Sequence, residues 1–362
     1  MKAFRLVDWG RADLADVPDP EPAPDEVLIR VAGTGLCRSD LHFMDAPPDG
    51  LRYPPPFTLG HEIAGWIEDV GASAHGASSV GDAVALYTID FCGRCAYCLD
   101  GAQNYCVAAT AGRGFGTDGG LARFAVARPE QLVPLRDLDP HTAPPLTDAG
   151  MTSYHAVARV LPKLRPGAVA VVIGVGGLGS FAVQLLRELS AAAVVALDTR
   201  ADRVPYAVGL GAAEAFDDAG DLVEAVRDIS HGRGADAVLD FVGATDSMRT
   251  ALRCASVRGS VVVIGVGGGA IGVERRDLPF ECELLFTRAG TPTDLAVVVR
   301  LAEQGRISVD AQLYGLDQVA DAYADLRSGR LVGRAVVVPE ARADGEDERR
   351  LTAPDTRPIL RG

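Results

Sequence analysis

The first part of the chain alternates between apolar and polar positions, which is typical of half-buried β-strands. The alternation is clear in the segments 4–7, 26–31, 63–70, 82–87 and 121–126. Turns rich in glycine or proline separate these segments, and the longest of them is the Pro- and Asp-rich stretch 16–25. Many short strands joined in this way predict an irregular β-barrel-like domain over residues 1–150.

The pattern changes near residue 147, where continuous apolar runs replace the alternation. A helix is expected over about 147–160, and buried strands are expected at 168–173, 193–198, 235–241 and 260–266. Uninterrupted apolar strands are typical of a parallel sheet that helices cover on both faces. We therefore expect a doubly wound α/β domain over residues 151–289.

The end of the chain has two further parts. Residues 290–340 contain an expected helix at 294–304 and an expected strand at 334–338, and we assign them to the first domain. Residues 341–362 are charged and without periodicity, so they are expected to form a disordered tail. No apolar run is long enough to span a membrane, and the first residues lack the apolar core of a signal peptide. These features predict a cytoplasmic protein.

Charge and cysteine content narrow the class of partner. The formal net charge is −14, whereas a protein that binds a phosphate backbone needs a basic face. The chain has seven cysteines, an odd number that favours metal binding or catalysis over a disulfide framework. We expect a small-molecule partner, and neither nucleic acid nor a membrane.

One short segment gathers unusually many reactive side chains. It runs Gly35-Leu36-Cys37-Arg38-Ser39-Asp40-Leu41-His42. His61 and Glu62 follow after a proline-rich turn. A thiolate and an imidazole from separate loops suit a catalytic zinc, with a third protein ligand still to be identified and one position left open. The alternative is a buried thiol with a capping histidine, because free cysteine is among the most buried residue types.

A second cysteine cluster lies further along the chain. Cys92, Cys95, Cys98 and Cys106 are separated by two, two and seven residues. Four thiolates at this spacing fill the tetrahedral shell of a zinc ion and leave no position open, which predicts a structural site. The alternatives are disulfides or an iron–sulfur cluster.

A glycine motif marks the start of the α/β domain. The sequence Gly174-Val175-Gly176-Gly177-Leu178-Gly179 follows an apolar strand and precedes an expected helix at 181–189. Such a turn lets a pyrophosphate approach the backbone and the helix N-terminus. Asp198 ends the next strand, where its carboxylate would accept hydrogen bonds from ribose hydroxyls and repel a 2′-phosphate, so NAD is favoured over NADP. Arg200 tempers this preference, and a tight turn that binds nothing is the alternative.

In this order, the three motifs resemble the zinc-dependent medium-chain alcohol dehydrogenase family, over residues 1 to about 340. The resemblance implies a GroES-like catalytic domain joined to a Rossmann cofactor domain. It implies reversible hydride transfer between an alcohol and NAD, giving a ketone or aldehyde, with one catalytic and one structural zinc per chain. It also implies a homo-oligomer, a dimer or a tetramer, in which cofactor-domain sheets join edge to edge.

The resemblance assigns roles to single residues. Cys37 and His61 match the first two ligands of the catalytic zinc, and Glu62 matches the residue that approaches the metal when ligands exchange. The third ligand, commonly a cysteine in the family, falls at Asp148, as in some bacterial secondary-alcohol dehydrogenases. The other matches are Ser39 and His42 for the proton relay, Asp40 for orienting His61, Arg38 and Arg334 for the pyrophosphate, Arg203 for the adenosine ribose and Thr152 for the nicotinamide.

The substrate is expected to be hydrophobic. The residues expected near the substrate pocket are Phe43, Leu51, Tyr53, Phe115, Phe280 and Phe286. Their character favours an aryl or medium-chain secondary alcohol. The alternatives are a related polyol, sugar or amino-alcohol dehydrogenase, a biosynthetic reductase, or a cofactor-binding protein that has lost the reaction.

Overall fold

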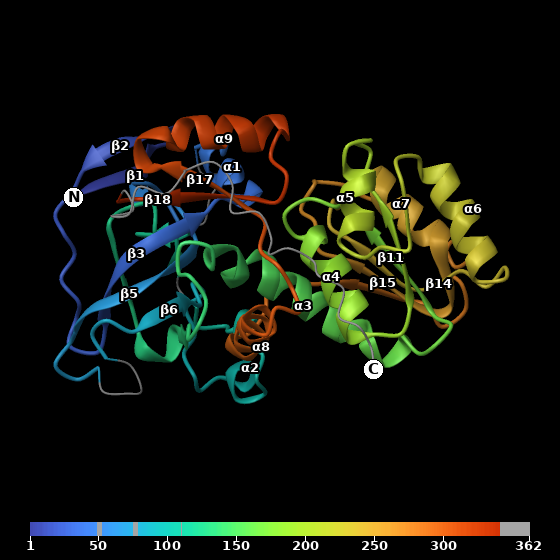
Figure 1. Ribbon diagram of the computed structural model, residues 1–362, viewed down its shortest axis with the longest axis horizontal. Helices are drawn as coiled ribbons and strands as arrows, with labels where there is room; N and C mark the ends of the chain where they lie inside the picture. Colours follow the sequence, from blue (N-terminus) through green and yellow to red (C-terminus); the bar gives the residue numbers. More distant parts are fainter. Residues whose placement is uncertain (49–52, 75–78, 110, 341–362) are drawn as a thin grey trace. The chain divides into compact units, whose positions relative to one another are not determined.

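The computed structural model describes residues 1–48, 53–74, 79–109 and 111–340. It divides into two compact units, one made of residues 1–95, 106–147 and 299–362 and the other of residues 96–105 and 148–298. The predicted tail, 341–362, lies outside the described residues. Figure 1 labels the main elements of both units.

Most of the regular secondary structure of the first unit is β-strand. Its strands are β1 (Lys2–Asp8), β2 (Arg11–Asp16), β3 (Val27–Gly35), β4 (Phe57–Thr58), β5 (Glu62–Val70), β6 (Ala83–Leu86), β7 (Gly112–Arg113), β8 (Gly116–Thr117), β9 (Phe124–Ala127), β10 (Leu132–Pro134), β17 (Ala311–Gly315) and β18 (Arg334–Val338). Its helices are α1 (Arg38–Met44) and α9 (Val319–Ser328), with the 3-10 turns η2 (Pro129–Gln131), η3 (Pro144–Thr147) and η5 (Leu316–Gln318).

The main sheet of this unit has the order β10-β6-β5-β3-β18-β17, and β9 also pairs with β3. A smaller sheet has the order β2-β1-β4. Since β18 pairs antiparallel with β3, the end of the described chain is built into the same sheet as its beginning. Two apolar clusters fill the interior of this unit, one around Ile29 and Ile67 and the other around Leu36 and Tyr323. This architecture confirms the expected irregular β-barrel domain.

The second unit alternates strands and helices. Its strands are β11 (Val169–Ile173), β12 (Ala193–Leu197), β13 (Glu214–Phe216), β14 (Ala235–Asp240), β15 (Ala255–Val263) and β16 (Glu283–Phe286). Its helices and 3-10 turns are α2 (Ala96–Leu99), η1 (Gln103–Tyr105), α3 (Ala149–Val160), η4 (Leu161–Lys163), α4 (Gly179–Leu189), α5 (Arg203–Gly209), α6 (Ala219–Ile229) and α7 (Thr245–Cys254). Helix α8 (Pro292–Glu303) spans the boundary between the two units.

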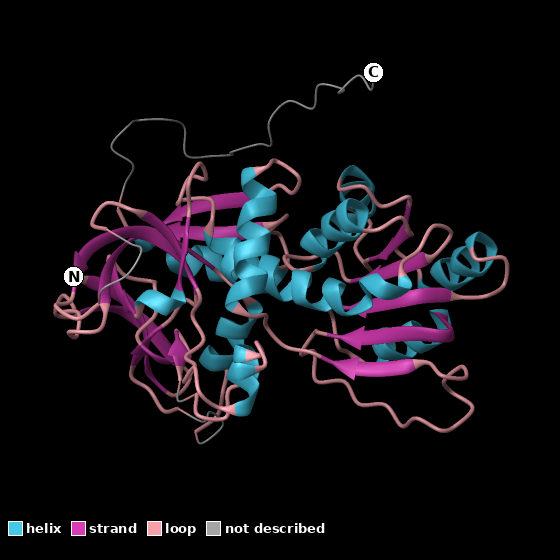
Figure 2. Cartoon of the chain, turned by 90° about the horizontal axis from the view of Figure 1, so that it is seen from below, coloured by secondary structure: helices cyan, strands magenta, loops and turns pink. Residues whose placement is uncertain are grey.

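All neighbouring strands of the second unit are parallel, in the order β13-β12-β11-β14-β15-β16. The chain starts in the middle, moves outward to one edge and then returns to build the other half, as in dinucleotide-binding folds. Val171, Val195 and Val238 are fully buried, as the continuous apolar runs predict. Figure 2 shows these strands side by side with helices packed along them. The doubly wound sheet is confirmed.

Some elements differ from the pattern-based expectation. The strand expected at 121–126 begins only at Phe124, and β15 begins at Ala255 rather than at Ser260. The alternation does not predict α1, because this helix is short and its sequence mixes polar and apolar residues without a clear period. Within the described ranges, no helix has the length and apolar character needed to cross a bilayer.

Candidate active site, structural metal lobe and cofactor turn

Cys37 sits where strand β3 gives way to helix α1. It is the residue before the helix, and its backbone N–H donates to Oδ2 of Asp40 at 3.0 Å. This local bond satisfies one of the otherwise unpaired N–H groups at the helix start and holds the backbone of Cys37 in place. Cys37 is buried, with 5% of its surface exposed.

Asp40 also holds the imidazole of His61. Its Oδ1 lies 3.0 Å from Nδ1 of His61, and both side chains are buried. Because a carboxylate can only accept, Nδ1 carries the proton and Nε2 carries the lone pair. This tautomer is the one that binds a metal through Nε2, with the carboxylate fixing the orientation of the ring. Asp40 thus orients both candidate ligands.

Glu62 completes a compact group of donor atoms. The Cys37 thiol, the His61 imidazole and the Glu62 carboxylate each offer an atom within 4.8 Å of the others. Ligands of a tetrahedral zinc are about 3.3–3.8 Å apart, so small adjustments suffice to hold one. A Cβ on Gly35 would overlap Glu62, so this glycine makes room for the carboxylate.

The charges of this group explain why a cation is needed. Glu62 is fully buried and forms an ion pair with the buried Arg334 of β18. Asp40 is fully buried as well, and the buried Cys37 would add a third negative charge as a thiolate. Buried carboxylates and a thiolate are costly unless cations compensate them. A divalent metal between Cys37 and His61 meets this requirement, and the donor set fits zinc.

The short helix α1 carries both residues predicted for proton transfer, Ser39 and His42, and one of the two predicted for the pyrophosphate, Arg38. The Cys37 thiol donates to Oγ of Ser39 at 3.5 Å. Ser39 is half-buried, whereas Arg38 and His42 are exposed. Ser39 and His42 are three positions apart and therefore lie on one face of α1.

Asp148 opens the second unit, directly after turn η3 of the first. Within the first unit, η3 packs against β3 and β5, the strands next to Cys37 and His61. The Asp148 Oδ1 accepts a hydrogen bond from Oγ1 of Thr152 at 3.0 Å. Its role as third ligand and the contact of Thr152 with nicotinamide stay predictions.

Two aromatic rings lie next to one another beside His61. The Phe115 ring stacks on the His61 ring with centroids 4.2 Å apart. Phe43 lies 5.0 Å from Phe115, centroid to centroid. These rings form an apolar wall beside the ligands, as the sequence predicts. Phe280 and Phe286 belong to the second unit and are exposed, and Leu51 lies outside the described residues.

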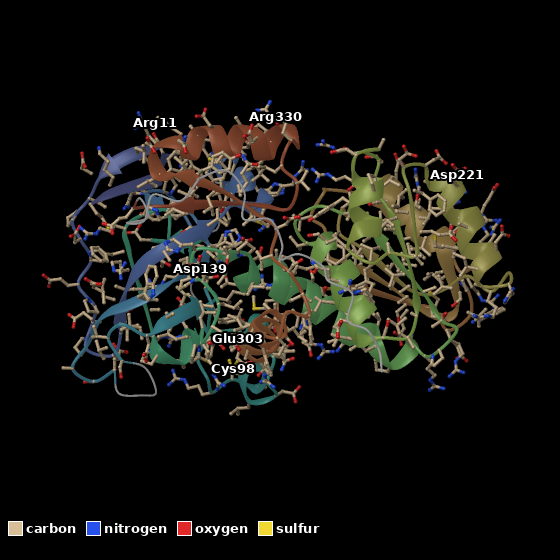
Figure 3. All side chains as sticks on the ribbon, in the orientation of Figure 1. Arg11, Cys98, Asp139, Asp221, Glu303 and Arg330 are labelled. Carbon is tan, nitrogen blue, oxygen red and sulfur yellow. The ribbon has the colours of Figure 1, made fainter. Side chains whose placement is uncertain are left out.

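The four cysteines of the lobe come together as their spacing predicts. Cys92, Cys95, Cys98 and Cys106 each offer a sulfur within 4.8 Å of the others. The Cys95 and Cys106 sulfurs are 3.9 Å apart, too far for a disulfide and close to the ~3.8 Å edge of a zinc–thiolate tetrahedron. Hydrogen bonds from the Arg94 and Cys95 backbone lower the pKa of Cys92 and favour its thiolate. Figure 3 labels Cys98 in this lobe.

The glycine turn connects β11 to α4. Gly174 has a φ of +87°, which favours glycine, and a Cβ on Gly179 would overlap the Gly174 carbonyl. Gly176 is exposed and has open space around it. Gly177 and Leu178 complete the turn, which Ser153 supports by donating its hydroxyl to the Leu178 carbonyl at 2.8 Å.

The Asp198 carboxylate closes this turn from the end of the next strand. Its Oδ2 accepts from the Val175 N–H at 2.8 Å, and its Oδ1 accepts from the Arg200 N–H at 3.1 Å. The Arg200 guanidinium is engaged by Asp202, with two hydrogen bonds of 3.0 Å. Arg203 is buried at the start of α5, with Nε 3.8 Å from Asp202.

Two buried residues near these sites have no counterpart in the motifs. Asp240 ends β14 and accepts hydrogen bonds from the Val242 and Gly243 backbone, while burial raises its pKa. Tyr323 of α9 is buried beside Asp40. Sequence patterns do not reveal the burial of either residue, because it depends on contacts between distant segments.

Family models match both halves of the chain. Residues 23–137 match the alcohol dehydrogenase GroES-like domain, and residues 177–303 match the zinc-binding dehydrogenase model. A protein named NAD-dependent alcohol dehydrogenase from Sulfurisphaera tokodaii is 32% identical and aligns over 94% of this chain and all of its own.

Two further relatives are informative. A D-arabinose 1-dehydrogenase (NADP(+)) from Saccharolobus solfataricus is 32% identical over 90% of this chain and 94% of its own length. The crystal structure of the alcohol dehydrogenase from Aeropyrum pernix superposes with a TM-score of 0.86, at 32% identity, over 94% of this chain and all of that one. The names of these relatives thus include both NAD and NADP as cofactors, and both alcohols and a sugar as substrates.

We predict that Cys92→Ser removes one zinc ion per chain and lowers the free energy of unfolding by at least about 2 kcal/mol, because a structural metal is lost. Metal analysis and thermal melting measure both effects. Cys282→Ser is the control, since Cys282 lies outside both clusters. An unchanged zinc content in Cys92→Ser would show that the lobe holds no zinc.

We predict that Gly179→Ala lowers the free energy of unfolding by about 1–3 kcal/mol, because the new methyl group meets the Gly174 carbonyl. The matched control is Gly176→Ala, which adds the same methyl group in open space and should change stability by less than about 0.5 kcal/mol. Denaturant unfolding compares the two. Equal destabilisation would contradict the assigned packing of the turn.

Proposed function

The chain belongs to the zinc-binding alcohol dehydrogenase family with a GroES-like domain, and we propose that it oxidises hydrophobic secondary alcohols with NAD, reversibly, to ketones. The observation that carries this proposal is the buried group of Cys37, His61 and Glu62, with Asp40 bonded to Nδ1 of His61. A protein that had lost the reaction would have no need to keep three buried acidic groups around an imidazole.

We propose that Cys37, His61 and Asp148 hold the catalytic zinc and that Glu62 approaches it during ligand exchange. When bound, the zinc acts as a Lewis acid on the oxygen of the alcohol or carbonyl substrate. The packing of η3 on β3 and β5 supports the assignment of Asp148, because consecutive Cα atoms are about 3.8 Å apart and Asp148 follows η3 directly. A carboxylate is also a good, though harder, ligand for zinc.

The protein's own groups would then move the proton. Ser39 is half-buried next to the Cys37 sulfur, so its hydroxyl can accept a proton from a substrate hydroxyl beside that ligand. His42 lies one helical turn further, on the exposed end of the same face, where it can release the proton to water. The nicotinamide ribose is the expected link between them.

NAD is the proposed cofactor. The open backbone at Gly176 leaves room for a pyrophosphate, and the α4 N-terminus favours its negative charge. The Asp198 carboxylate at the turn would repel a 2′-phosphate, and Asp202 already engages the Arg200 guanidinium that could attract one. We assign Arg38 and Arg334 to the pyrophosphate, Arg203 to the adenosine ribose and Thr152 to the nicotinamide.

The apolar wall supports one of the two substrate classes. The Phe115 ring stacks on His61, the Phe43 ring lies against Phe115, and the half-buried Tyr53 lies next to Gly116. Such rings favour an aryl or aliphatic substituent and provide few groups for the hydroxyls of a sugar, which need hydrogen-bond partners when they lose water. The second candidate is a pentose dehydrogenase, in line with the relative named for D-arabinose.

We predict NADH formation from aryl and medium-chain secondary alcohols, faster than from D-arabinose and faster with NAD than with NADP. Ser39→Ala should lower kcat by roughly 10²–10⁴-fold while NAD affinity is kept, because one proton acceptor is lost. The rate of NADH formation, followed by absorbance across a panel of substrates with and without a zinc chelator, measures both the substrate preference and the effect of the variant. Ser328→Ala, at the exposed end of α9, is the control.

Two outcomes would contradict this assignment. Preference for D-arabinose would favour the sugar dehydrogenase, and unchanged turnover in Ser39→Ala would exclude the relay. Gly176→Ala adds a separate check on the cofactor turn, because its methyl group should weaken NAD binding without affecting stability.

We further propose that two copies join through strand β16. This strand pairs with β15 and ends the described sheet on that side. Phe280, Phe286 and Val257 are 73%, 67% and 58% exposed, so this side of the sheet is both open and apolar. An exposed strand edge with apolar neighbours is a template for pairing with another chain. A dimer formed in this way can pair again into a tetramer.

We predict that Phe280→Lys combined with Phe286→Lys dissociates the oligomer, because charges replace apolar side chains at the edge. Light scattering coupled to size-exclusion chromatography measures the mass. Val208→Lys on α5, which is 48% exposed, is the control for surface charge. An unchanged oligomer in the double variant would place the interface elsewhere.

The cysteines support a cytoplasmic location. Four of them form the predicted zinc lobe and one is the predicted ligand Cys37, and zinc thiolates persist best where thiols stay reduced.

A further inference from the structure

Helix α9 lies against α1, the helix that starts at Cys37. The two helices belong to the same unit, although their sequences are far apart, and Figure 1 labels both. At the surface, Arg327 of α9 forms two hydrogen bonds with the Asp45 carboxylate, at 2.6 and 2.8 Å. This pair also lines a pocket of about 350 Å³, together with Met44 and Tyr323. The contact between the two helices therefore includes an ion pair at the surface and a buried aromatic side chain.

Tyr323 is held in a defined position. Only 5% of its surface is exposed, and its ring stacks on Phe4 with centroids 5.7 Å apart. Its hydroxyl is buried near the Asp40 carboxylate, where a weak hydrogen bond to Asp40 contributes to its raised pKa, but it makes no hydrogen bond of full geometry among the described residues. Burial raises the pKa of Tyr323 well above its ordinary value, and the negative charge of Asp40 raises it further. The hydroxyl thus keeps its proton and faces a carboxylate.

The Asp40 carboxylate has room for another donor. Its Oδ1 takes the His61 Nδ1–H and its Oδ2 takes the Cys37 N–H, each at 3.0 Å. A carboxylate offers about four lone-pair sites. Since a buried hydroxyl without a well-formed hydrogen bond is costly, a small shift that shortens its contact with Asp40 is favourable.

We propose that Tyr323 is a positioning residue, whose hydroxyl donates to Asp40 when His61 holds zinc. The proposal rests on the proposed zinc site and concerns a residue outside its ligands. With this third bond, the carboxylate that orients His61 is fixed from both helices. The bond also draws negative charge away from His61, which keeps the metal a stronger Lewis acid.

Tyr323→Phe tests this inference, because it removes the hydroxyl and keeps the ring. We expect the zinc affinity at the Cys37 site to fall about threefold to tenfold. Removing a group that supports a metal ligand typically lowers the affinity somewhat more than this, but here two other bonds to Asp40 remain. We expect the apparent pKa on the acid side of the kcat/KM profile to rise, because more negative charge stays near the metal. Chelator competition and the visible spectrum of the cobalt-substituted protein report on the site without requiring turnover.

Tyr314→Phe is the matched control. The Tyr314 hydroxyl donates to Oδ2 of Asp325 at 2.8 Å, so the variant also removes a tyrosine–carboxylate bond, here between β17 and α9 and not to Asp40. It should cost similar stability and leave the metal affinity, the cobalt spectrum and the pH profile as in the unmodified protein. The effect of Tyr323→Phe should also shrink in an Asp40→Asn background, where the acceptor charge is gone.

Two results would overturn the inference. One is a Tyr323→Phe protein with the zinc affinity, cobalt spectrum and pH profile of the Tyr314→Phe control. The other is a loss of affinity that persists in full in the Asp40→Asn background. If the unmodified protein held no metal at Cys37, the proposed function would fail instead, so the two failures are distinguishable.

Discussion

The bond between Asp40 and His61 is the interaction on which the rest of the site depends. It joins the start of α1 to the start of β5 and selects the histidine tautomer that can bind a metal. The same carboxylate fixes Cys37 through its backbone N–H. Its burial is costly because Glu62 and Cys37 bring further acidic groups nearby. Arg334 offsets part of this charge, and a divalent cation is the natural source of the rest.

The sheet of the first unit places these groups at one point. Strand β3 lies between β5 and β18, and Gly35 is opposite Glu62 on one side and Val336 on the other. The strand ends therefore bring together side chains from the beginning and the end of the described chain. Gly35 has a defined part in this arrangement, since any larger residue would displace the Glu62 carboxylate. A one-residue slip in either pairing would move these side chains to the other face.

Short-range patterns in the sequence are sufficient to predict the fold class, the cysteine lobe and the glycine turn. Their determinants lie within about 25 residues, as with Gly174 and Asp198. The pairing of Glu62 with Arg334 and the burial of Tyr323 beside Asp40 are not predictable in this way, because they depend on strand order and helix packing. The helix α1 is missed for another reason: it is short, its sequence mixes polar and apolar residues without a clear period, and its stability comes from a cap and from contacts with α9.

The most direct test of this account is X-ray absorption at the zinc edge of the purified protein, calibrated by metal content. Two zinc ions per chain should share five sulfur ligands, four from the lobe and one from Cys37, with nitrogen and oxygen completing the second site. A single zinc ion bound by sulfur alone would contradict it. In that case the buried acidic groups around His61 would need a different cation, and the proposed reaction would lack its catalytic zinc.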